Sequence, residues 1–180
     1  MLILVGPSAS GKTEVAKYLK KMYQIDKIIT YTTRTPRMNE QKDVDYHFIS
    51  LEEFAQLKEQ DFFVETTYYN HHYYGTAKKD ILDDKCIILD PNGLKSFLSL
   101  NNPRIVSIYL DCEEEIRLQR MLKRNDPFVE AQKRIVNDRI AFYDKNLNGV
   151  TFVIDSSQDN IEQLGDKIYN LYHNLLVSLD

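Results

Sequence analysis

Short apolar runs alternate along most of the chain with stretches in which apolar residues recur at helical spacing. Four runs are typical of buried strands: LILV at 2–5, CIILD at 86–90, IVSIYLD at 105–111 and VTFVID at 150–155. Four stretches are typical of amphipathic helices: about 12–22, 113–124, 128–146 and 160–177. Strands that alternate with helices in this way favour a parallel sheet joined by right-handed crossovers. The sequence therefore predicts an α/β fold.

Residues 30–79 break this rhythm. The segment is rich in threonine, tyrosine and phenylalanine, and it carries one helix signal, SLEEFAQL, with Ser50 as a candidate N-cap and Glu53 at the capping-box position. We interpret the segment as a small β-rich insertion into the α/β domain. The length of 180 residues fits one domain. We expect the core of that domain at residues 1–29, 80–119 and 147–180.

The composition narrows the possible partners. Hydrophobic residues make up 43% of the chain and charged residues 28%, as in an ordinary soluble globular domain. Apolar runs of about five residues are far shorter than the roughly 20 that a membrane helix needs, so we expect no membrane partner. The net charge of −4 disfavours a nucleic-acid partner, because such proteins usually carry a basic face. It leaves room for a small anionic ligand held by a local group of arginines.

The cysteines and the start of the chain bear on the cellular compartment. Cys86 and Cys112 fall in or at the end of predicted strands, so we expect no disulfide framework and favour a reducing compartment. The first strand begins at Leu2, and the sequence before it lacks the basic and apolar regions of a secretion signal. We therefore expect a cytoplasmic protein.

The stretch GPSASGKT, residues 6–13, matches the phosphate-loop pattern G-x-x-x-x-G-K-[ST] in full, with a strand before it and a helix after it. Its glycines let the backbone wrap closely round a phosphate with the N–H groups pointing inward. Lys12 is expected to reach the β- and γ-phosphates, and the Thr13 hydroxyl to be a ligand of Mg²⁺. The triphosphate-binding residues predicted from this loop are Gly6, Ser8, Ala9, Ser10, Gly11, Lys12 and Thr13. By itself the motif leaves a kinase, a switch and a motor open.

Four downstream stretches carry more specific information: TYTTRTPRMNEQKDVDYHF at 30–48, FFVETTYY at 62–69, YYGT at 73–76 and ILDPNG at 88–93. At these residues the chain resembles the guanylate kinase family, whose signature runs approximately [ST]-x-[ST]-T-R-x-P-R, E-x-x-G-x-D-Y-x-F, F-x-E and Y-G-[ST]. The resemblance covers essentially the whole chain. It implies a P-loop-type parallel sheet flanked by helices, a nucleoside-monophosphate-binding insertion at 30–79 and a short helical lid at about 120–146. It also implies transfer of a phosphoryl group from ATP to GMP in the presence of Mg²⁺.

The resemblance assigns the acceptor phosphate to Arg34 and Arg37, together with Tyr46 and Tyr74. This assignment makes physical sense, since guanidinium forks match phosphate oxygens and phenol hydroxyls donate further hydrogen bonds. The alternative is that the arginines lie on an ordinary surface and the tyrosines are partly buried packing residues.

The resemblance assigns guanine to Glu65, whose carboxylate would accept from the N1–H and 2-amino groups, and places Thr30 and Thr76 near the base. Glu65 also fits a strand in which it simply faces solvent. Asp90 follows a buried strand, and three roles stay open for it: near Mg²⁺, near the base, or capping the PNG turn.

Three arginines, Arg117, Arg120 and Arg124, recur at helical spacing and share one helix face. The simplest reading is a solvated face on which Glu113 pairs with Arg117. The resemblance instead assigns Arg120 and Arg124 to the lid that closes over the triphosphate. A third lid arginine is matched best by Arg134, with Arg139 as the alternative. Such cations neutralise charge on a phosphoryl group in transfer.

The sequence departs from the family pattern at several positions. Ala9 and Ser10 replace a usual glycine and a small residue, Thr30 replaces a serine, and Ile88 stands where typical members carry the first of two aspartates. The lid region is about one residue shorter than common forms. These departures indicate a divergent member with an altered preference among nucleotides.

Two other functions are alternatives to a GMP kinase. One is a kinase of the same fold that acts on a different nucleoside monophosphate or on a sugar phosphate. The other is a non-catalytic interaction module, which is disfavoured because such modules typically lose the phosphate loop that is intact here. His71 and His72 are not expected to bind a metal, because adjacent strand residues point to opposite faces. The sequence leaves a monomer and a homodimer equally open.

Overall fold

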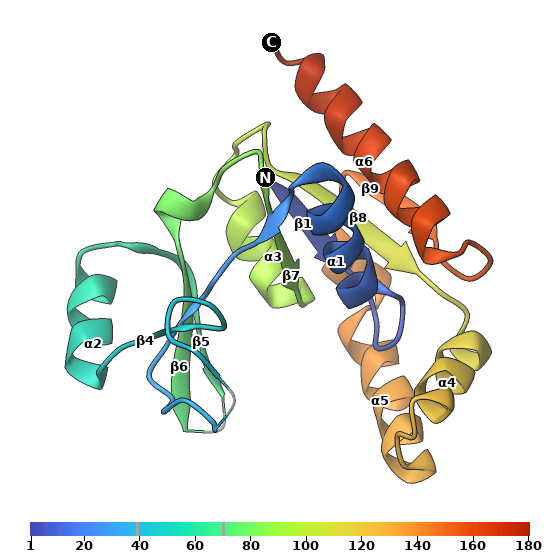
Figure 1. Cartoon of the computed structure of the whole chain (residues 1–180), viewed down its shortest axis with the longest axis horizontal. Coiled ribbons are helices and arrows are strands. Elements are labelled where there is room, and N and C mark those ends of the chain that lie inside the picture. Colours follow the sequence, from blue (N-terminus) through green and yellow to red (C-terminus); the bar gives the residue numbers. More distant parts are fainter. Residues whose placement is uncertain (39, 70) are drawn as a thin grey trace.

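Five parallel strands form the central sheet of the computed structural model, which describes residues 1–38, 40–69 and 71–180 (Figure 1). Across the sheet the order is β2-β7-β1-β8-β9, with β1 at the centre. The strands are β1 (Leu2–Val5), β2 (Asp26–Lys27), β7 (Lys85–Leu89), β8 (Val106–Asp111) and β9 (Phe152–Asp155). This arrangement confirms the predicted α/β class. The two-residue strand β2 at the edge was not predicted.

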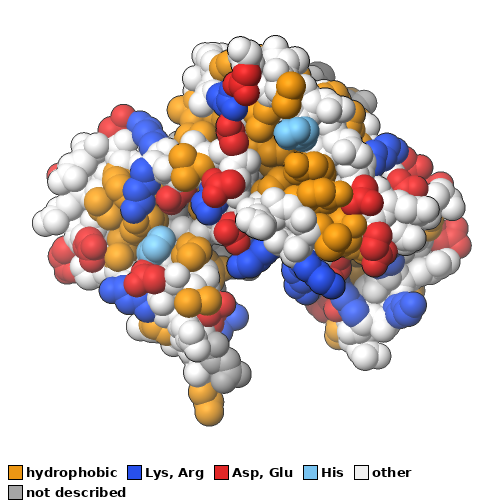
Figure 2. All heavy atoms as spheres, turned by 45° about the horizontal axis from the view of Figure 1, so that its top comes forward, with side chains coloured by type: hydrophobic (Ala, Val, Ile, Leu, Met, Phe, Trp, Pro, Cys, Tyr) orange, Lys and Arg blue, Asp and Glu red, His pale blue; other side chains and the backbone are white. Residues whose placement is uncertain are grey.

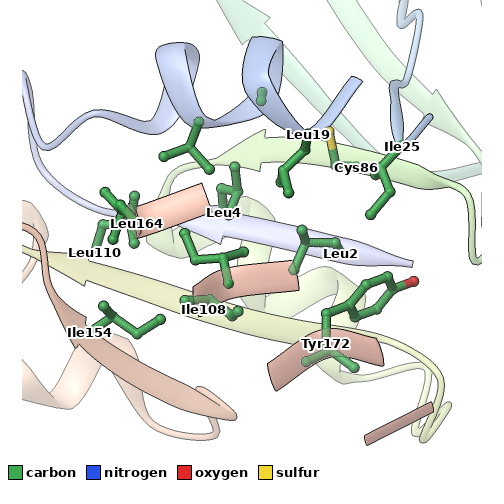
Figure 3. Packing of buried hydrophobic residues seen from close by; sticks show 14 of the residues in the cluster. Leu2, Leu4, Leu19, Ile25, Cys86, Ile108, Leu110, Ile154, Leu164 and Tyr172 are labelled. Atoms are coloured by element: carbon green, nitrogen blue, oxygen red, sulfur yellow. The ribbon is translucent and has the colours of Figure 1, made fainter. Parts of the chain in front are cut away.

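Both faces of this sheet are covered, which explains why β1 is apolar at every position. Leu2 and Leu4 pack in a cluster with α1 (Lys12–Tyr23) and α6 (Ile161–Val177), the packing drawn in Figure 3. Ile3 and Val5 point to the opposite face, where the cluster includes residues of α3 (Pro91–Leu98). Successive side chains of a strand alternate between faces, so a continuous apolar run supplies both clusters.

The strand register brings the ends of three strands to one edge. Val5 at the end of β1 pairs with Leu89 of β7 and with Tyr109 of β8. The loop after β1 and the residues after β7 and β8 therefore emerge side by side. In open parallel sheets this carboxyl edge is where ligands bind.

A second, four-stranded mixed sheet is built from residues within 31–77, in the order β4-β3-β6-β5. Its elements are β3 (Tyr31–Thr32), β4 (His47–Phe48), α2 (Leu51–Glu59), β5 (Phe63–Tyr69) and β6 (His72–Ala77), followed by the short helix η1 (Lys78–Asp80). It has a separate small core of Tyr31, Phe54, Phe63 and Ala77. As predicted, Ser50 caps α2, and its Oγ accepts a hydrogen bond from the Glu53 N–H at 3.0 Å. The tyrosine-rich stretch forms an antiparallel pair of strands, β5 and β6, within the predicted β-rich insertion.

An α-helical hairpin of α4 (Glu114–Lys123) and α5 (Phe128–Ala141) extends from the core on the other side of the molecule (Figure 1). The prediction of helix up to residue 146 was wrong, because α5 ends at Ala141. Phe142 turns into the sheet core, where its ring stacks on Tyr109 at 6.1 Å, and a separate 3₁₀ turn, η2 (Asp144–Leu147), follows.

The segment after Asp90 also differs from the sequence expectation. We expected a turn at PNG, but residues Pro91–Leu98 form α3. Asp90 caps this helix by accepting a hydrogen bond from the Gly93 N–H at 2.8 Å, and Pro91 suits its first turn because proline needs no hydrogen-bond acceptor there. Cys86 and Cys112 are buried free thiols, in agreement with the prediction. No helix in the described residues is long and apolar enough to cross a membrane.

Candidate active site

The phosphate loop joins the end of β1 to the start of α1. A side chain at Gly6 would place its Cβ 2.7 Å from the Leu110 carbonyl oxygen of the neighbouring strand, so only glycine fits. Gly11 has a φ of +98° and precedes the first residue of α1. Ala9 also adopts a left-handed φ of +62°, which costs about 1 kcal/mol for a residue with a Cβ. The usual glycine would avoid that cost.

A cavity of about 710 Å³ opens in front of this loop. One wall is the loop with the start of α1, where the first N–H groups of a helix have no intrahelical acceptor and can bind an anion. Arg120 and Arg124 of the α4–α5 hairpin form part of another wall. The segment between β9 and α6 supplies Ser156, Asp159, Asn160 and Ile161.

Sequence reasoning missed these four residues. The sequence does contain a pattern that could have indicated this region. Asn160 and Gln163 form a capping box, which marks the start of α6 beside the cavity.

Lys12 lies folded against its own loop. Its Nζ donates hydrogen bonds to the carbonyl oxygens of Gly6 at 2.6 Å and Pro7 at 2.7 Å, with Ser10 Oγ at 3.4 Å. Burial lowers the pKa of Lys12 to about 8, the negative charge of Asp138 opposes this shift, and the positive charge of Arg117 adds to it. The ammonium group is therefore only partly compensated here, so a phosphate is an electrostatically favourable partner.

Thr13 and Ser8 face different surroundings. The Thr13 side chain lines the cavity, is exposed, and has no hydrogen-bond partner within the described parts of the chain. Its hydroxyl is free to take an additional partner. Ser8, in contrast, is turned toward α5, and its N–H donates to Asp138 Oδ2 at 2.8 Å.

The five arginines of the α4–α5 hairpin separate into four groups. Arg120 is fixed beside the loop, donating to the carbonyl oxygens of Ala9 at 3.3 Å and Ser156 at 2.8 Å. Arg124 and Arg134 both form ion pairs with Asp126, at 2.6 and 3.1 Å. This shared partner favours Arg134 over Arg139 as the third lid arginine. Arg139 pairs instead with Glu114 at 2.6 Å.

Arg117 forms the fourth group and, unlike Arg120 and Arg124, does not line the cavity. The expectation of a solvated Arg117 paired with Glu113 was wrong, because its side chain is only 4% exposed and binds Asp138 at 2.7 Å.

In the insertion, Arg34 is already held in a two-pronged ion pair. Its Nη1 and Nη2 each donate to a carboxylate oxygen of Glu40 at 2.8 Å, and Nη1 also donates to the Thr35 carbonyl at 3.0 Å. The Nε–H and the second Nη2–H form the other edge of the guanidinium, which neither Glu40 nor the Thr35 carbonyl occupies. That edge is suited to two phosphate oxygens.

The predicted tyrosines lie next to Arg34. Its guanidinium is over the Tyr46 ring at 5.3 Å, and the Tyr46 ring is 6.1 Å from Tyr74. Hydrogen bonding to Glu40, foremost, and to Tyr74 raises the pKa of Arg34. The structure thus brings Arg34, Tyr46 and Tyr74 together, as the sequence predicted for a phosphate clamp.

Glu40 is a residue that sequence reasoning did not single out, although it stands in the quoted stretch. Its carboxylate accepts from Arg34 and from the Arg37 backbone N–H at 2.8 Å. These bonds, the Arg34 bond first, lower the pKa of Glu40 to about 2. Glu40 therefore fixes the loop that carries both predicted phosphate-binding arginines.

Glu65 is held by two threonines of the same sheet. Thr76 Oγ1 donates to Oε1 at 2.8 Å and Thr67 Oγ1 to Oε2 at 3.2 Å, so both oxygens keep a lone pair for a ligand. Burial is the main cause that raises the pKa of Glu65, and the negative charge of Asp90 contributes. Thr76 is fully buried and so positions the carboxylate. Thr30 stands just before β3, where its carbonyl accepts from the His47 N–H at 2.9 Å.

The action of Asp90 on Glu65 shows that the two carboxylates lie within electrostatic range. Asp90 also sits at the carboxyl end of β7, next to the central strand, where its capping bond to α3 fixes the side chain. Of the roles that the sequence left open, capping is observed, and the proximity to Glu65 favours the base over Mg²⁺.

The insertion and the α4–α5 hairpin stand on opposite sides of a hollow. Figure 2 shows this hollow with Lys and Arg side chains gathered on both of its flanks. A phosphate loop that faces, across this hollow, an insertion carrying an arginine, two tyrosines and a half-buried glutamate defines a P-loop kinase of the nucleoside monophosphate class.

The chain belongs to the guanylate kinase family, whose model, described as guanylate kinase, matches residues 1–172. A guanylate kinase of Helicobacter pylori (strain ATCC 700392 / 26695) is 35% identical over 146 residues, which cover 76% of this chain and 70% of the relative. A guanylate kinase of Aster yellows witches'-broom phytoplasma (strain AYWB) is 33% identical over 168 residues, covering 78% of this chain and 80% of the relative. The resemblance read from the sequence is confirmed.

Solved structures agree in fold. The crystal structure of guanylate kinase from Anaplasma phagocytophilum has a TM-score of 0.66 at 21% identity, covering 97% of this chain and 84% of the other. The YorR protein of Bacillus subtilis, in complex with phosphorylated GDP, has a TM-score of 0.53 at 15% identity and covers 96% of both chains.

The phosphate clamp leads to a first prediction. Replacing Arg34 or Arg37 with lysine should weaken acceptor binding, because an ammonium cannot reproduce the guanidinium fork. Each charged hydrogen bond lost is worth about 1.5–3 kcal/mol, or roughly tenfold or more in affinity. Calorimetric titration with GMP and, separately, with ATP measures both sites in one variant. Equal losses for the two ligands would contradict separate sites.

Proposed function

We propose that the protein transfers the γ-phosphoryl group of ATP to the phosphate of GMP or dGMP, giving ADP and GDP or dGDP. The observation that carries the proposal is Glu65, held by Thr76 in the insertion that also carries Arg34, Tyr46 and Tyr74. An ionised carboxylate only accepts hydrogen bonds, and guanine offers two adjacent donors. The guanine nucleotide in the YorR complex and the family membership support the same acceptor.

The residues would divide the work between two substrates. Lys12 and the first N–H groups of α1 bind the β- and γ-phosphates, while Arg34, Arg37, Tyr46 and Tyr74 bind the acceptor phosphate. An acceptor phosphate oxygen then forms a bond to the γ-phosphorus as the bond to the β–γ bridging oxygen breaks. Catalysis of this transfer rests on positioning and on neutralising charge, so no covalent intermediate is required.

Mg²⁺ fits the same site. Thr13 presents an exposed hydroxyl without a protein partner in the described residues, beside the cavity in front of the loop. A hydroxyl, phosphate oxygens and waters are the hard oxygen ligands that Mg²⁺ prefers. When bound, the ion would neutralise charge on the β- and γ-phosphates. Asp90 is assigned in this proposal to the guanine side.

The proposed division into parts follows the same assignment. Residues 1–29, 80–119 and 147–180 form the core, 30–79 bind the acceptor, and about 120–146 form the lid with Arg120, Arg124 and Arg134. The ATP base would lie against Asn160 and Ile161 in the cavity. The buried free thiols suit a reducing compartment, and we place the protein in the cytoplasm.

The test is a panel of nucleoside monophosphates offered with MgATP, with ADP release followed for each. GMP and dGMP should be phosphorylated and AMP, CMP and UMP should not. Turnover of a different monophosphate in preference to GMP would identify that nucleotide as the acceptor instead. Absence of turnover with all of them would contradict the proposed enzymatic activity.

Closure of the two flanks is a second prediction. The lid arginines and the clamp lie on opposite sides of the hollow, and phosphoryl transfer requires water to be excluded between them. Small-angle X-ray scattering should show a smaller radius of gyration with GMP and a non-hydrolysable ATP analogue together than with no ligand. Identical scattering profiles in the two states would contradict closure.

A further inference from the structure

Asp138 of α5 is the one carboxylate that binds the phosphate loop among the described residues. Its Oδ2 accepts from the Ser8 N–H at 2.8 Å, and its Oδ1 accepts from Ser8 Oγ at 3.3 Å. Both polar groups of Ser8 therefore point away from the cavity and toward α5. The carboxylate is 13% exposed, so these bonds are largely shielded from water.

Arg117 in turn holds the Asp138 carboxylate in place. Arg117 Nη1 donates to Asp138 Oδ2 at 2.7 Å, while its Nε donates to the Cys112 carbonyl at 3.2 Å. The same Nη1 lies 3.4 Å from the Ser8 carbonyl oxygen. These three contacts hold the buried guanidinium, and through it the Asp138 carboxylate, in a defined position relative to the end of β8 and the phosphate loop.

Apolar packing joins the same elements. Ala9, the residue after Ser8, packs against the cluster of Met121, Ala131 and Ile135 between α4 and α5. The loop therefore contacts the helical hairpin on both its polar and its apolar side. The hairpin also carries the proposed lid arginines, so a movement of the lid would be transmitted to the phosphate loop through these contacts.

We propose that Asp138 is a positioning residue for ATP, which holds the first half of the phosphate loop in its open shape through Ser8. With Ser8 tied back, the triphosphate is bound by Lys12 and by the N–H groups from the start of α1. The role rests on the proposed function, since it is a role toward the ATP of that reaction.

A buried ion pair that only stabilises the fold would behave differently. Loss of its acid would leave Arg117 with only the weaker contact to Glu114 at 4.0 Å, lower the melting temperature, and affect both substrates equally. A positioning role affects ATP alone, because the hydrogen bonds of Ser8 within the described part of the chain go to Asp138 and Arg117 and none goes to the insertion. The conservative variant Asp138→Asn keeps an oxygen that can accept from Ser8, whereas Asp138→Ala removes the bridge. Both variants remove the charge of Asp138 and leave Arg117 with Glu114 at 4.0 Å as its remaining counter-charge, so comparing them separates geometry from charge.

The experiment compares Asp138→Ala, Asp138→Asn and the control Glu115→Gln, which removes a charge from an exposed position of the same hairpin. Affinities for ATP and for GMP are titrated separately, and KM and kcat are measured for each substrate. We expect Asp138→Ala to lose on the order of 100-fold in kcat/KM for ATP, the size typical of a small misplacement, with unchanged GMP affinity. Asp138→Asn should retain most of the ATP affinity, and Glu115→Gln all of it.

A double variant, Arg117→Met with Asp138→Ala, removes both buried charges and guards against simple unfolding. It should recover the melting temperature but stay impaired for ATP. The role is overturned if Asp138→Ala binds ATP as tightly as wild type, if it binds ATP more tightly, or if ATP and GMP are lost in parallel with the melting temperature. Wild-type protein that binds no ATP would overturn the proposed function as well as this role.

Discussion

Replacing Lys12 with alanine will lower kcat by at least about 10²–10³-fold, the cost of removing one group that stabilises transition-state charge. The ammonium lies inside the loop, bonded to the neutral Gly6 and Pro7 carbonyls, and the negative charge of Asp138 compensates it only in part. In the complex we expect it to leave these carbonyls for the β- and γ-phosphates. A single-turnover assay with MgATP and GMP measures the loss directly.

The same change should not destabilise the ligand-free protein. Burial lowers the pKa of Lys12 from its ordinary 10.5 to about 8, so the charged form costs up to about 3 kcal/mol below pH 8, at about 1.4 kcal/mol per pKa unit. Because the unfolded chain binds the proton more tightly, the penalty is present below pH 8 and fades as the pH rises toward 10.5. Removing the side chain removes the penalty, so the melting temperature should stay the same or rise.

Lys21→Ala is the matched control, since Lys21 is an exposed lysine on the same helix. It should change neither turnover nor ATP affinity. Near-normal turnover in Lys12→Ala would show that the phosphate loop is not the ATP site.

The second large effect concerns the base. We expect GMP to be preferred over AMP by roughly 10⁴ or more, the discrimination typical of a site built round a buried hydrogen-bonding group. Adenine presents an acceptor at N1 and lacks the 2-amino group, so the Glu65 carboxylate would face a lone pair. Both oxygens of Glu65 are already oriented by Thr76 and Thr67, which leaves the carboxylate little freedom to turn away.

Glu65→Gln and Glu65→Ala should collapse this preference, as measured by the ratio of kcat/KM values for GMP and AMP. Glu59→Gln, at an exposed position of the same insertion, is the control and should keep the ratio. Full discrimination in Glu65→Ala would assign guanine recognition to other residues. Ile88, in place of an aspartate, bears on the absolute rate for GMP but not on the direction of the preference.

The raised pKa of Glu65 gives this site a pH dependence of known sign. Burial favours the protonated form, so as the pH falls the carboxylate takes up a proton earlier than an exposed glutamate does. The protonated group can no longer accept from both guanine donors, and GMP affinity should fall. The phosphate of GMP also titrates near pH 6. The difference between wild type and Glu65→Gln isolates the contribution of Glu65, and identical pH profiles would contradict it.

Local sequence determined the central features of this protein. The phosphate loop could be read residue by residue, because close approach at Gly6 and the left-handed φ at Gly11 admit few residue types. The four longer strands of the central sheet were predicted because a strand buried on both faces must be apolar throughout. Arg34, Tyr46 and Tyr74 could be predicted as a group because the motif that contains them lies within one small insertion.

Only the tertiary structure decided the features that depend on contacts between distant segments. Arg117 reads as a surface arginine, since nothing in its own helix shows that Asp138, 21 residues later, lies beneath it. The same holds for Asp138 and Ser8, which are 130 residues apart. α5 ends at Ala141, where the partly buried Phe142 packs against Tyr109 of the central sheet, a contact that the local sequence does not reveal. Asp90 shows the remaining ambiguity of sequence, because one carboxylate caps a helix and also acts on Glu65 across the two sheets.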